Sequence, residues 1–396
     1  MDYFATALER HRQHQGKIEV RSRMRLESVE DLSLAYTPGV AAPCEAIAAR
    51  PAEAWDLTWK GRTVAVVSDG SAVLGLGNLG GMASLPVMEG KAALFREFGG
   101  VDAVPIVLDT QDEDEVVRVV RAIAPTFGGI NLEDISAPRC FRIEQRLQDL
   151  GIPVLHDDQH GTAIVLLAAL WNATRVTGLP MQQLKVVING AGAAGRAIAR
   201  LLCCQDPHDR CIPVAKVRVC DSKGVLYPSR GDLDGYKLEM AQWTNPEDEG
   251  GSLRDALRGA NAFIGVSKGN LLRADDIRTM AKDAIVLAMA NPTPEILPDE
   301  AERGGAAIVG TGRSDFPNQV NNVLAFPGLF RGALEARARR FTTAMKFAAI
   351  EAIAAAAGDP APKRILPAAF DRSVAVAVAE SVAAAARQSG ACEAAS

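Results

Sequence analysis

The sequence predicts an α/β protein with an N-terminal α/β domain over residues 1–160. A Rossmann-like, doubly wound dinucleotide-binding domain with a helical C-terminal tail is predicted over residues 161–396. Two observations lead to this prediction. Short apolar runs typical of buried strands alternate with segments of helical periodicity, which is the pattern of a parallel sheet covered by helices. One of these runs also ends in a glycine-rich turn that precedes a further helical segment.

The first domain is expected to contain a parallel sheet. The apolar runs at 63–70, 104–110 and 151–158 predict buried strands, and the last of them ends in acidic residues. Ligand sites in such sheets lie at the carboxyl ends of the strands. A helix is expected over 162–178, and the stretch just before residue 184 is the best candidate for the domain junction.

The second domain opens with the run LKVVINGAGAAG at 184–195. Gly190, Gly192 and Gly195 form a G-x-G-x-x-G turn, with Ala193 and Ala194 between the last two glycines. Such a turn lets the backbone approach a pyrophosphate, and the N–H groups of the following helix attract its charge. A tight strand-to-helix turn without a ligand is the alternative. Further strands are expected at 216–221, 260–267, 283–292 and 306–312, and helices from about residue 328.

An acidic residue is expected at the end of the next strand, where it would bind the adenosine ribose. Asp221 occupies this place, although a Cys-rich insert at 203–215 makes the spacing longer than usual. A carboxylate here favours NAD, whereas the neighbouring Ser222 and Lys223 could hold a 2′-phosphate and admit NADP. The sequence leaves both cofactors open.

Composition excludes several classes of protein. The formal net charge of −5 disfavours partners such as nucleic acid or a membrane surface. No apolar run approaches the roughly 20 residues that cross a bilayer. The N-terminal segment is Arg-rich, but Asp2, Glu9 and Glu19 argue against a transit peptide. Seven scattered cysteines predict reduced thiols in the cytoplasm rather than a disulfide framework, and none shows zinc-site spacing.

Two acidic pairs stand next to apolar runs: Glu133–Asp134, and Asp157–Asp158. Carboxylates gathered at strand ends repel one another unless a cation lies between them, and a hard ion such as Mg²⁺ or Mn²⁺ prefers oxygen ligands. Helix capping is the alternative for each pair taken alone. His156 and His160 flank the second pair, but without a third soft ligand they are weaker support for zinc.

Six long blocks, in this order, resemble the signature segments of bacterial malic enzymes. They are LAYTPGVA (34–41), VLGLGNLGGMASLPVMEGKAALF (73–95), FGGINLEDISAP (127–138), VLHDDQHGTAI (154–164), ANPTPEI (290–296) and TGRSDFPNQVNNVLAFPGLFRGAL (311–334). The resemblance extends from about residue 10 to about residue 385. It implies oxidative decarboxylation of malate to pyruvate with NAD or NADP and Mg²⁺ or Mn²⁺, in a homodimer or larger homo-oligomer.

The resemblance also implies roles for individual residues. Lys91 corresponds to the general base that takes the proton of the C2 hydroxyl, and Tyr36 to the general acid that returns a proton at C3. The metal ligands would be Glu133, Asp134 and Asp158, with Asp157 as a supporting neighbour. Asn291 and Asn322 would contact cofactor and substrate, and the adjacent Asn321 could share that work. Each residue taken singly also has a structural explanation, such as packing or capping.

One position departs from the animal and plant enzymes, which have an arginine that grips a malate carboxylate where this chain has Val73. Substrate identity is therefore less certain than reaction class. Three alternatives stay open: a malolactic enzyme of the same family, a metal-independent amino-acid dehydrogenase, and a nucleotide-sensing regulator without turnover. Net NADH formation from malate and inhibition by EDTA would distinguish the first two from a malic enzyme.

Overall fold

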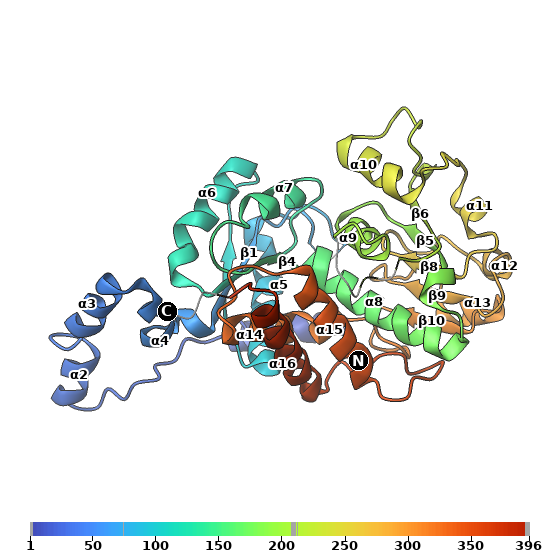
Figure 1. Ribbon diagram of the computed structural model, residues 1–396. Helices are drawn as coiled ribbons and strands as arrows, with labels where there is room; N and C mark the ends of the chain where they lie inside the picture. The colour runs from blue at the N-terminus through green and yellow to red at the C-terminus, as the bar shows by residue number, and fades with distance from the viewer. Residues whose placement is uncertain (1–2, 74, 207–210, 212, 393–396) are drawn as a thin grey trace.

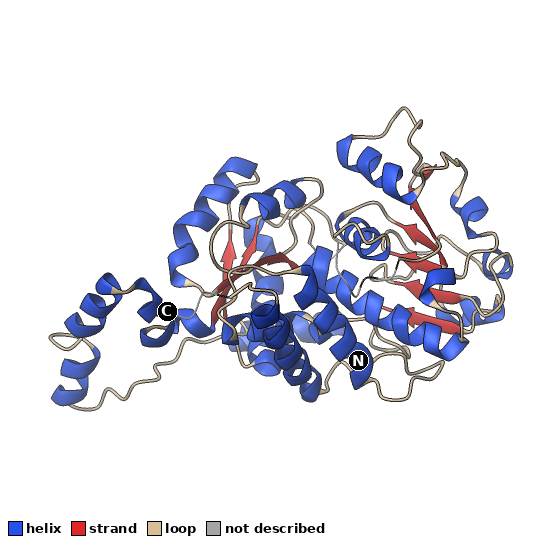
Figure 2. Cartoon of the chain, in the orientation of Figure 1, coloured by secondary structure: helices blue, strands red, loops and turns tan. Residues whose placement is uncertain are grey.

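The computed structural model describes residues 3–73, 75–206, 211 and 213–392. It contains two sheets with helices around them (Figure 1), and Figure 2 shows the strands of the two sheets as separate groups. The predicted α/β class with a Rossmann-like second domain is thereby confirmed. No helix in the described part of the chain has the length and apolar character needed to cross a membrane.

The first sheet has four parallel strands in the order β2-β1-β3-β4. They are β1 (Thr63–Ser68), β2 (Asp102–Val107), β3 (Gly129–Leu132) and β4 (Val154–His156). Every residue of β1 is buried, because a central parallel strand is covered on both faces. The segments that connect the strands of this sheet contain α5 (Gly81–Leu94), the π-helical turn η3 (Phe95–Gly99), α6 (Glu113–Ile123), η4 (Ala124–Thr126) and α7 (Arg139–Arg146).

Helix α8 (Asp157–Thr177) begins directly after β4 and is buried on nearly all sides. The prediction placed a strand up to residue 158 and a helix from 162, so the strand boundary was wrong. Asp157 and Asp158 form the first turn of α8 instead, where acidic side chains are favoured by the helix dipole. The expected domain division at residue 160 therefore falls inside a helix. Helix α8 packs against α9 (Ala193–Leu202) of the second part and α15 (Thr343–Ala356) of the C-terminal part.

The second sheet has the order β10-β9-β8-β5-β6-β7. After η5 (Met181–Gln183), its strands are β5 (Lys185–Asn189), β6 (Lys216–Asp221), β7 (Gly224–Val225), β8 (Ala262–Gly265), β9 (Ile285–Ala288) and β10 (Ile308–Thr311). The helices are α9 (Ala193–Leu202), α10 (Gly235–Thr244), α11 (Leu253–Leu257), α12 (Ala274–Arg278) and α13 (Pro298–Arg303). This is the doubly wound order, except that β7 is a two-residue antiparallel strand.

The C-terminal chain returns to the first part of the molecule. It forms η6 (Asn322–Leu324), α14 (Phe326–Glu335), α15 (Thr343–Ala356) and α16 (Arg372–Gln388). The rings of Phe326 and Phe330 lie 4.7 and 5.4 Å from that of Phe95 in η3. The predicted helical tail is confirmed, and it packs beside the first sheet as well as along α8.

The cysteines differ from the sequence-based expectation. Cys204 and Cys211 form a disulfide, which corrects the prediction that every cysteine is a reduced thiol. The two residues are seven positions apart and meet just after the end of α9, a proximity that counting cysteines could not predict.

The N-terminal elements are α1 (Tyr3–His14), α2 (Val29–Ala35), α3 (Ala41–Ala49), η1 (Pro51–Glu53), α4 (Ala54–Leu57) and η2 (Trp59–Arg62). Figure 1 shows α2 and α3 projecting from the end of the molecule that is farther from the second sheet.

Candidate active site

Three carboxylates converge at the carboxyl end of the first sheet. Glu133 and Asp134 follow β3, and Asp158 lies in the first turn after β4. Because Leu132 pairs with His156, these strands end side by side. One oxygen from each of the three carboxylates lies within 4.8 Å of the others. The convergence predicted from the sequence is therefore observed.

The turn at Asp134 is fixed by the backbone. Asp134 has a positive φ of 53°, a conformation that Asp and Asn tolerate better than most residues. Its N–H donates to Asp158 Oδ2 at 2.8 Å, which ties the end of β3 to the start of α8. Asn131, buried within β3, donates to Glu133 Oε2 at 2.8 Å. The sequence analysis missed Asn131, whose only signal is a polar residue inside an apolar strand.

Lys91 reaches this cluster from α5. Its Nζ lies 2.6 Å from Asp157 Oδ2 and 2.9 Å from Glu133 Oε1, and 4.1 Å from the centre of the Phe326 ring. Asn322 also donates to Asp157 Oδ2 through its side-chain amide. The structure thus brings together Lys91, the acids and Asn322, which are far apart in the sequence.

The ionisation of these groups is strongly coupled. Burial alone would lower the pKa of Lys91, but the carboxylates of Asp157 and Glu133 outweigh this effect and raise that pKa above its ordinary value. Burial, followed by repulsion from neighbouring carboxylates, raises the pKa of Glu133 well above that of an exposed glutamate, although Lys91 opposes the shift. Burial likewise raises the pKa of Asp157. Ionising all of these buried carboxylates beside a single lysine is therefore unfavourable.

The donor set suits a hard divalent cation. Asp157 Oδ1 is buried and accepts no hydrogen bond from the described residues. Asp158 keeps 36% of its side chain exposed, so the cluster is reachable from solvent. His160 does not serve the cluster, because its ring nitrogens contact Glu144 and Lys346. Carboxylate oxygens in this arrangement fit Mg²⁺ or Mn²⁺ better than zinc.

The glycine-rich turn has the shape of a phosphate-binding loop. Gly190 has a φ of +131°, and a Cβ there would lie 2.5 Å from the Val266 carbonyl oxygen. A Cβ on Gly195 would overlap the Gly190 carbonyl oxygen, whereas one on Gly192 would meet nothing within 4 Å. The open side at Gly192 precedes α9, whose first residues are Ala193 and Ala194. Two glycines thus permit the tight turn, and the third leaves room for a ligand.

This turn adjoins the first part of the molecule. Ala193 packs against the core beneath the first sheet, and the Arg196 guanidinium carbon lies 4.8 Å from the centre of the Phe141 ring on α7. A Cβ on Gly75, in the loop after β1, would lie 3.0 Å from the Asn291 carbonyl oxygen at the end of β9. The carboxylate cluster and the glycine-rich turn therefore share one interdomain region.

Asp221 ends β6 inside a cluster of charges. Its Oδ2 accepts from Arg230 Nη2 at 2.8 Å and from Lys237 Nζ at 3.1 Å. Burial would raise the pKa of Asp221, but these hydrogen bonds and that from the Lys223 N–H lower it. Arg230 and Lys237 were missed by the sequence analysis, because α10 and the preceding loop approach Asp221 only in three dimensions.

The other predicted residues have different surroundings. Val73 is buried, so no basic group takes its place there. Asn321 accepts from the Val323 N–H at 3.0 Å and caps η6. Tyr36 ends α2 and is 67% exposed. Since α2 and α3 project away from the first sheet (Figure 1), the structure does not bring Tyr36 together with Lys91 of the same chain.

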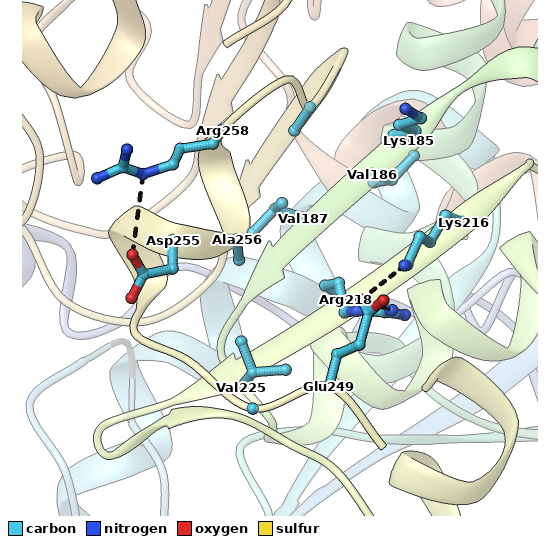
Figure 3. Close-up of a pocket in the computed structure, with 12 residues that line it drawn as sticks. Lys185, Val186, Val187, Lys216, Arg218, Val225, Glu249, Asp255, Ala256 and Arg258 are labelled. Carbon is cyan, nitrogen blue, oxygen red and sulfur yellow. Dashed lines mark hydrogen bonds and ion pairs between the residues drawn. The ribbon is translucent and has the colours of Figure 1, made fainter. Parts of the chain in front are cut away.

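A separate cavity of about 240 Å³ lies at the opposite end of the second sheet, where β5 and β6 begin. Figure 3 shows ion pairs between charged side chains that line it: Lys216 and Arg218 with Glu249, and Arg258 with Asp255. The Gly190 turn follows the other end of β5. This cavity therefore lies apart from the candidate active site.

Comparison with known proteins agrees with this arrangement. Residues 15–148 match the family described as malic enzyme, N-terminal domain, and residues 159–387 match malic enzyme, NAD binding domain. A bifunctional malic/malolactic enzyme of Bacillus subtilis (strain 168) is 53% identical over 388 residues, covering 97% of this chain and 93% of the relative. An NAD-dependent malic enzyme of Geobacillus stearothermophilus is 51% identical over 378 residues, covering 95% of this chain and 77% of the relative. The crystal structure of an NAD-dependent malic enzyme from Thermotoga maritima has a TM-score of 0.91 at 49% identity, covering 95% of this chain and 98% of that one. The chain belongs to the malic enzyme family.

Proposed function

We propose that this chain oxidises and decarboxylates malate to pyruvate, with NAD or NADP as hydride acceptor and Mg²⁺ or Mn²⁺ bound by Glu133, Asp134 and Asp158. The observation that carries the proposal is the contact of Lys91 with Asp157 and Glu133 inside the carboxylate cluster. If the cluster holds a cation, the Lys91 amine lies close enough to act as a proton acceptor beside it, in the same region as the glycine-rich turn.

A divalent cation at this cluster would polarise the C2 oxygen of malate and stabilise the negative charge that decarboxylation develops. Lys91 takes the C2 hydroxyl proton at Nζ, which requires the neutral amine. Without bound positive charge, the surrounding carboxylates favour the protonated form of Lys91, which cannot accept a further proton. A cation held by Glu133, Asp134 and Asp158 would neutralise these carboxylates and so favour the neutral amine that acts as the base.

We further propose that Tyr36 protonates C3 in the site of a second copy of the chain. The tyrosine is exposed, and its helices project away from the Lys91 of its own chain. Apolar side chains on the same projecting segment are also exposed, namely those of Val29, Leu32 and Leu34. Such a surface is typical of an interface with another subunit. A homodimer in which the segments are exchanged would complete both sites.

A spectrophotometric assay tests the proposed reaction. Malate with each dinucleotide, with and without Mn²⁺, should give NADH or NADPH only when the cation is present. Lys91→Ala and Tyr36→Phe should each lower turnover by about 10²–10⁴-fold while the protein stays folded. Full activity in excess EDTA would contradict the metal site, and turnover near that of the wild type in either variant would contradict its assigned role.

A malolactic activity is the second candidate function, because the Bacillus subtilis relative is named as bifunctional. In that reaction the pyruvate is reduced before release, so lactate forms without net NADH. Measuring lactate and NADH in the same malate reaction separates the two activities. Lactate without NADH would favour the second candidate.

A further inference from the structure

A buried carboxylate lies behind the first turn of α8, on α7, and no step of the proposed reaction uses it. Glu144 Oε1 accepts from the His156 N–H at 3.1 Å, and Oε2 accepts from the Gln159 side-chain amide at 3.0 Å. The ring Nε2 of His160 lies 3.0 Å from Oε1 and 3.1 Å from Oε2. One carboxylate thus holds three donors from five consecutive residues at the start of α8.

The chain of contacts continues to the C-terminal helices. Lys346, on α15, lies with its Nζ 3.1 Å from His160 Nδ1. A protonated Lys346 can only donate, so with this lysine charged Nδ1 accepts and the ring proton resides on Nε2. His160 therefore donates to Glu144 while it accepts from Lys346. The result is a directed chain from Lys346 through the neutral imidazole to the Glu144 carboxylate.

The same helical turn divides its side chains between two directions. The His156 N–H and the side chains of Gln159 and His160 contact Glu144, whereas the His156 ring lies with Nε2 3.4 Å from Asp158 Oδ2. Asp157 turns to Lys91 and Asn322, and Asp158 to the carboxylate cluster. Burial would raise the pKa of Glu144, but the hydrogen bond from His160 and the charge of Lys346 outweigh this effect and lower it. Glu144 is thus a fixed negative charge that anchors this turn from behind.

We propose that Glu144 is a positioning residue for the cation site, held in turn by His160 and Lys346. By fixing the first turn of α8, it sets where the Asp157 and Asp158 carboxylates lie relative to Lys91 and Glu133. The inference rests on the proposed metal function of the cluster. Outer-shell partners of ligands typically change metal affinity by 10–100-fold when they are mutated.

Mn²⁺ binding without substrate provides the test, measured by titration calorimetry on the full-length chain. Glu144→Gln removes the charge and presents an amide to donors, and should weaken Mn²⁺ binding by about tenfold or more. NADH binding, followed by fluorescence, should stay within about twofold, because a loss of overall folding would lower both affinities. Glu335→Gln, which removes an exposed ion pair with Arg331 on α14, is the matched control and should leave Mn²⁺ binding unchanged.

A pair of substitutions at His160 tests the chain of contacts separately. His160→Gln keeps an acceptor for Lys346 and a donor for Glu144, and should retain most of the Mn²⁺ affinity. His160→Leu keeps the bulk but removes both hydrogen bonds, and should lose affinity as Glu144→Gln does. Equal binding by these two variants would overturn the chain of contacts even if Glu144→Gln failed to fold.

The outcomes separate this inference from the proposed function. If the wild type binds no Mn²⁺, the metal site itself is wrong. If the wild type binds Mn²⁺, Glu133→Gln abolishes binding and Glu144→Gln binds normally, the metal site stands and the positioning role of Glu144 is overturned.

Discussion

At the scale of the residue, Glu133 would couple protonation to the proposed cation binding. It is buried beside other carboxylates and beside one lysine, and burial is the largest cause of its raised pKa. An acid with a raised pKa holds its proton more tightly in the folded chain than in the unfolded chain. Without a cation, Glu133 therefore contributes less stability as the pH rises above the pKa it has in the unfolded chain.

We expect Mn²⁺ affinity to change with pH in the opposite direction. As the pH falls from about 8 towards about 5, protons should compete for Glu133 and weaken Mn²⁺ binding, because metal ligands must be deprotonated. Calorimetric titrations in buffers of different ionisation enthalpy should also detect proton release on binding. An affinity that is constant over this range would contradict the role of Glu133 as a ligand.

Lys237 is expected to influence which dinucleotide is accepted. It and Arg230 already neutralise Asp221, so the end of β6 repels a 2′-phosphate less than a free carboxylate would. Lys237→Gln should raise the KM for NADP by about tenfold, which corresponds to about 1.4 kcal/mol, and change that for NAD little. Lys185→Gln is the control. Lys185 begins β5 and so lies at the end of the sheet opposite to Asp221, and its substitution should change neither KM. Equal effects of Lys237→Gln on both cofactors would rule out this role.

At the scale of elements, the first turn of α8 contains Asp157 and Asp158, two acids that were predicted to end a strand. Strands and the glycine-rich turn could be predicted because apolar runs and Gly190, Gly192 and Gly195 are local signals. The first-turn acids Asp157 and Asp158 resemble a strand end in the sequence until the preceding strand is known to stop at His156. Contacts between residues that are far apart in the sequence could not be predicted from such local signals.

Glycines on α5 and α8 offer a sharp comparison. A Cβ on Gly161 would overlap Asp157 Oδ1, so Gly161→Ala should displace that carboxylate from Lys91 and lower turnover by about tenfold or more. Gly90→Ala lies next to Lys91, but its Cβ would meet nothing within 4 Å. It should retain turnover and gain up to about 1 kcal/mol in unfolding free energy from helix propensity. Steady-state kinetics and urea unfolding measure both effects, and an active Gly161→Ala would show that Asp157 need not stay in place.

At the scale of the whole molecule, the proposed cation-binding acids, Lys91 and Asn322 could be grouped through the family resemblance before their contacts were known. The projection of α2 and α3 could not be predicted, because nothing in the AYTPG segment shows whether Tyr36 faces the site of its own chain. The Cys204–Cys211 disulfide and the return of α14 to η3 also depend on chain paths that residue patterns do not describe.

Subunit mixing tests the exchange of Tyr36. Tyr36→Phe and Lys91→Ala chains should each be nearly inactive, but unfolding and refolding them together should restore about a quarter of wild-type turnover. Half of a random dimer mixture is hybrid, and one of the two sites in each hybrid has both wild-type groups. Mixing the chains without refolding is the control. No recovery in a verified hybrid would show that Tyr36 acts within its own chain.

Asn322 and Phe326 contact Asp157 and Lys91 although 165 residues separate Asn322 from Asp157. During synthesis, a nascent chain can complete its first sheet long before these two residues leave the ribosome. Until they do, Lys91 lacks the aromatic ring that covers it and Asp157 lacks its amide partner. The proposed catalytic groups can therefore come together only late in translation, and a chain that stops before residue 322 should not turn over malate.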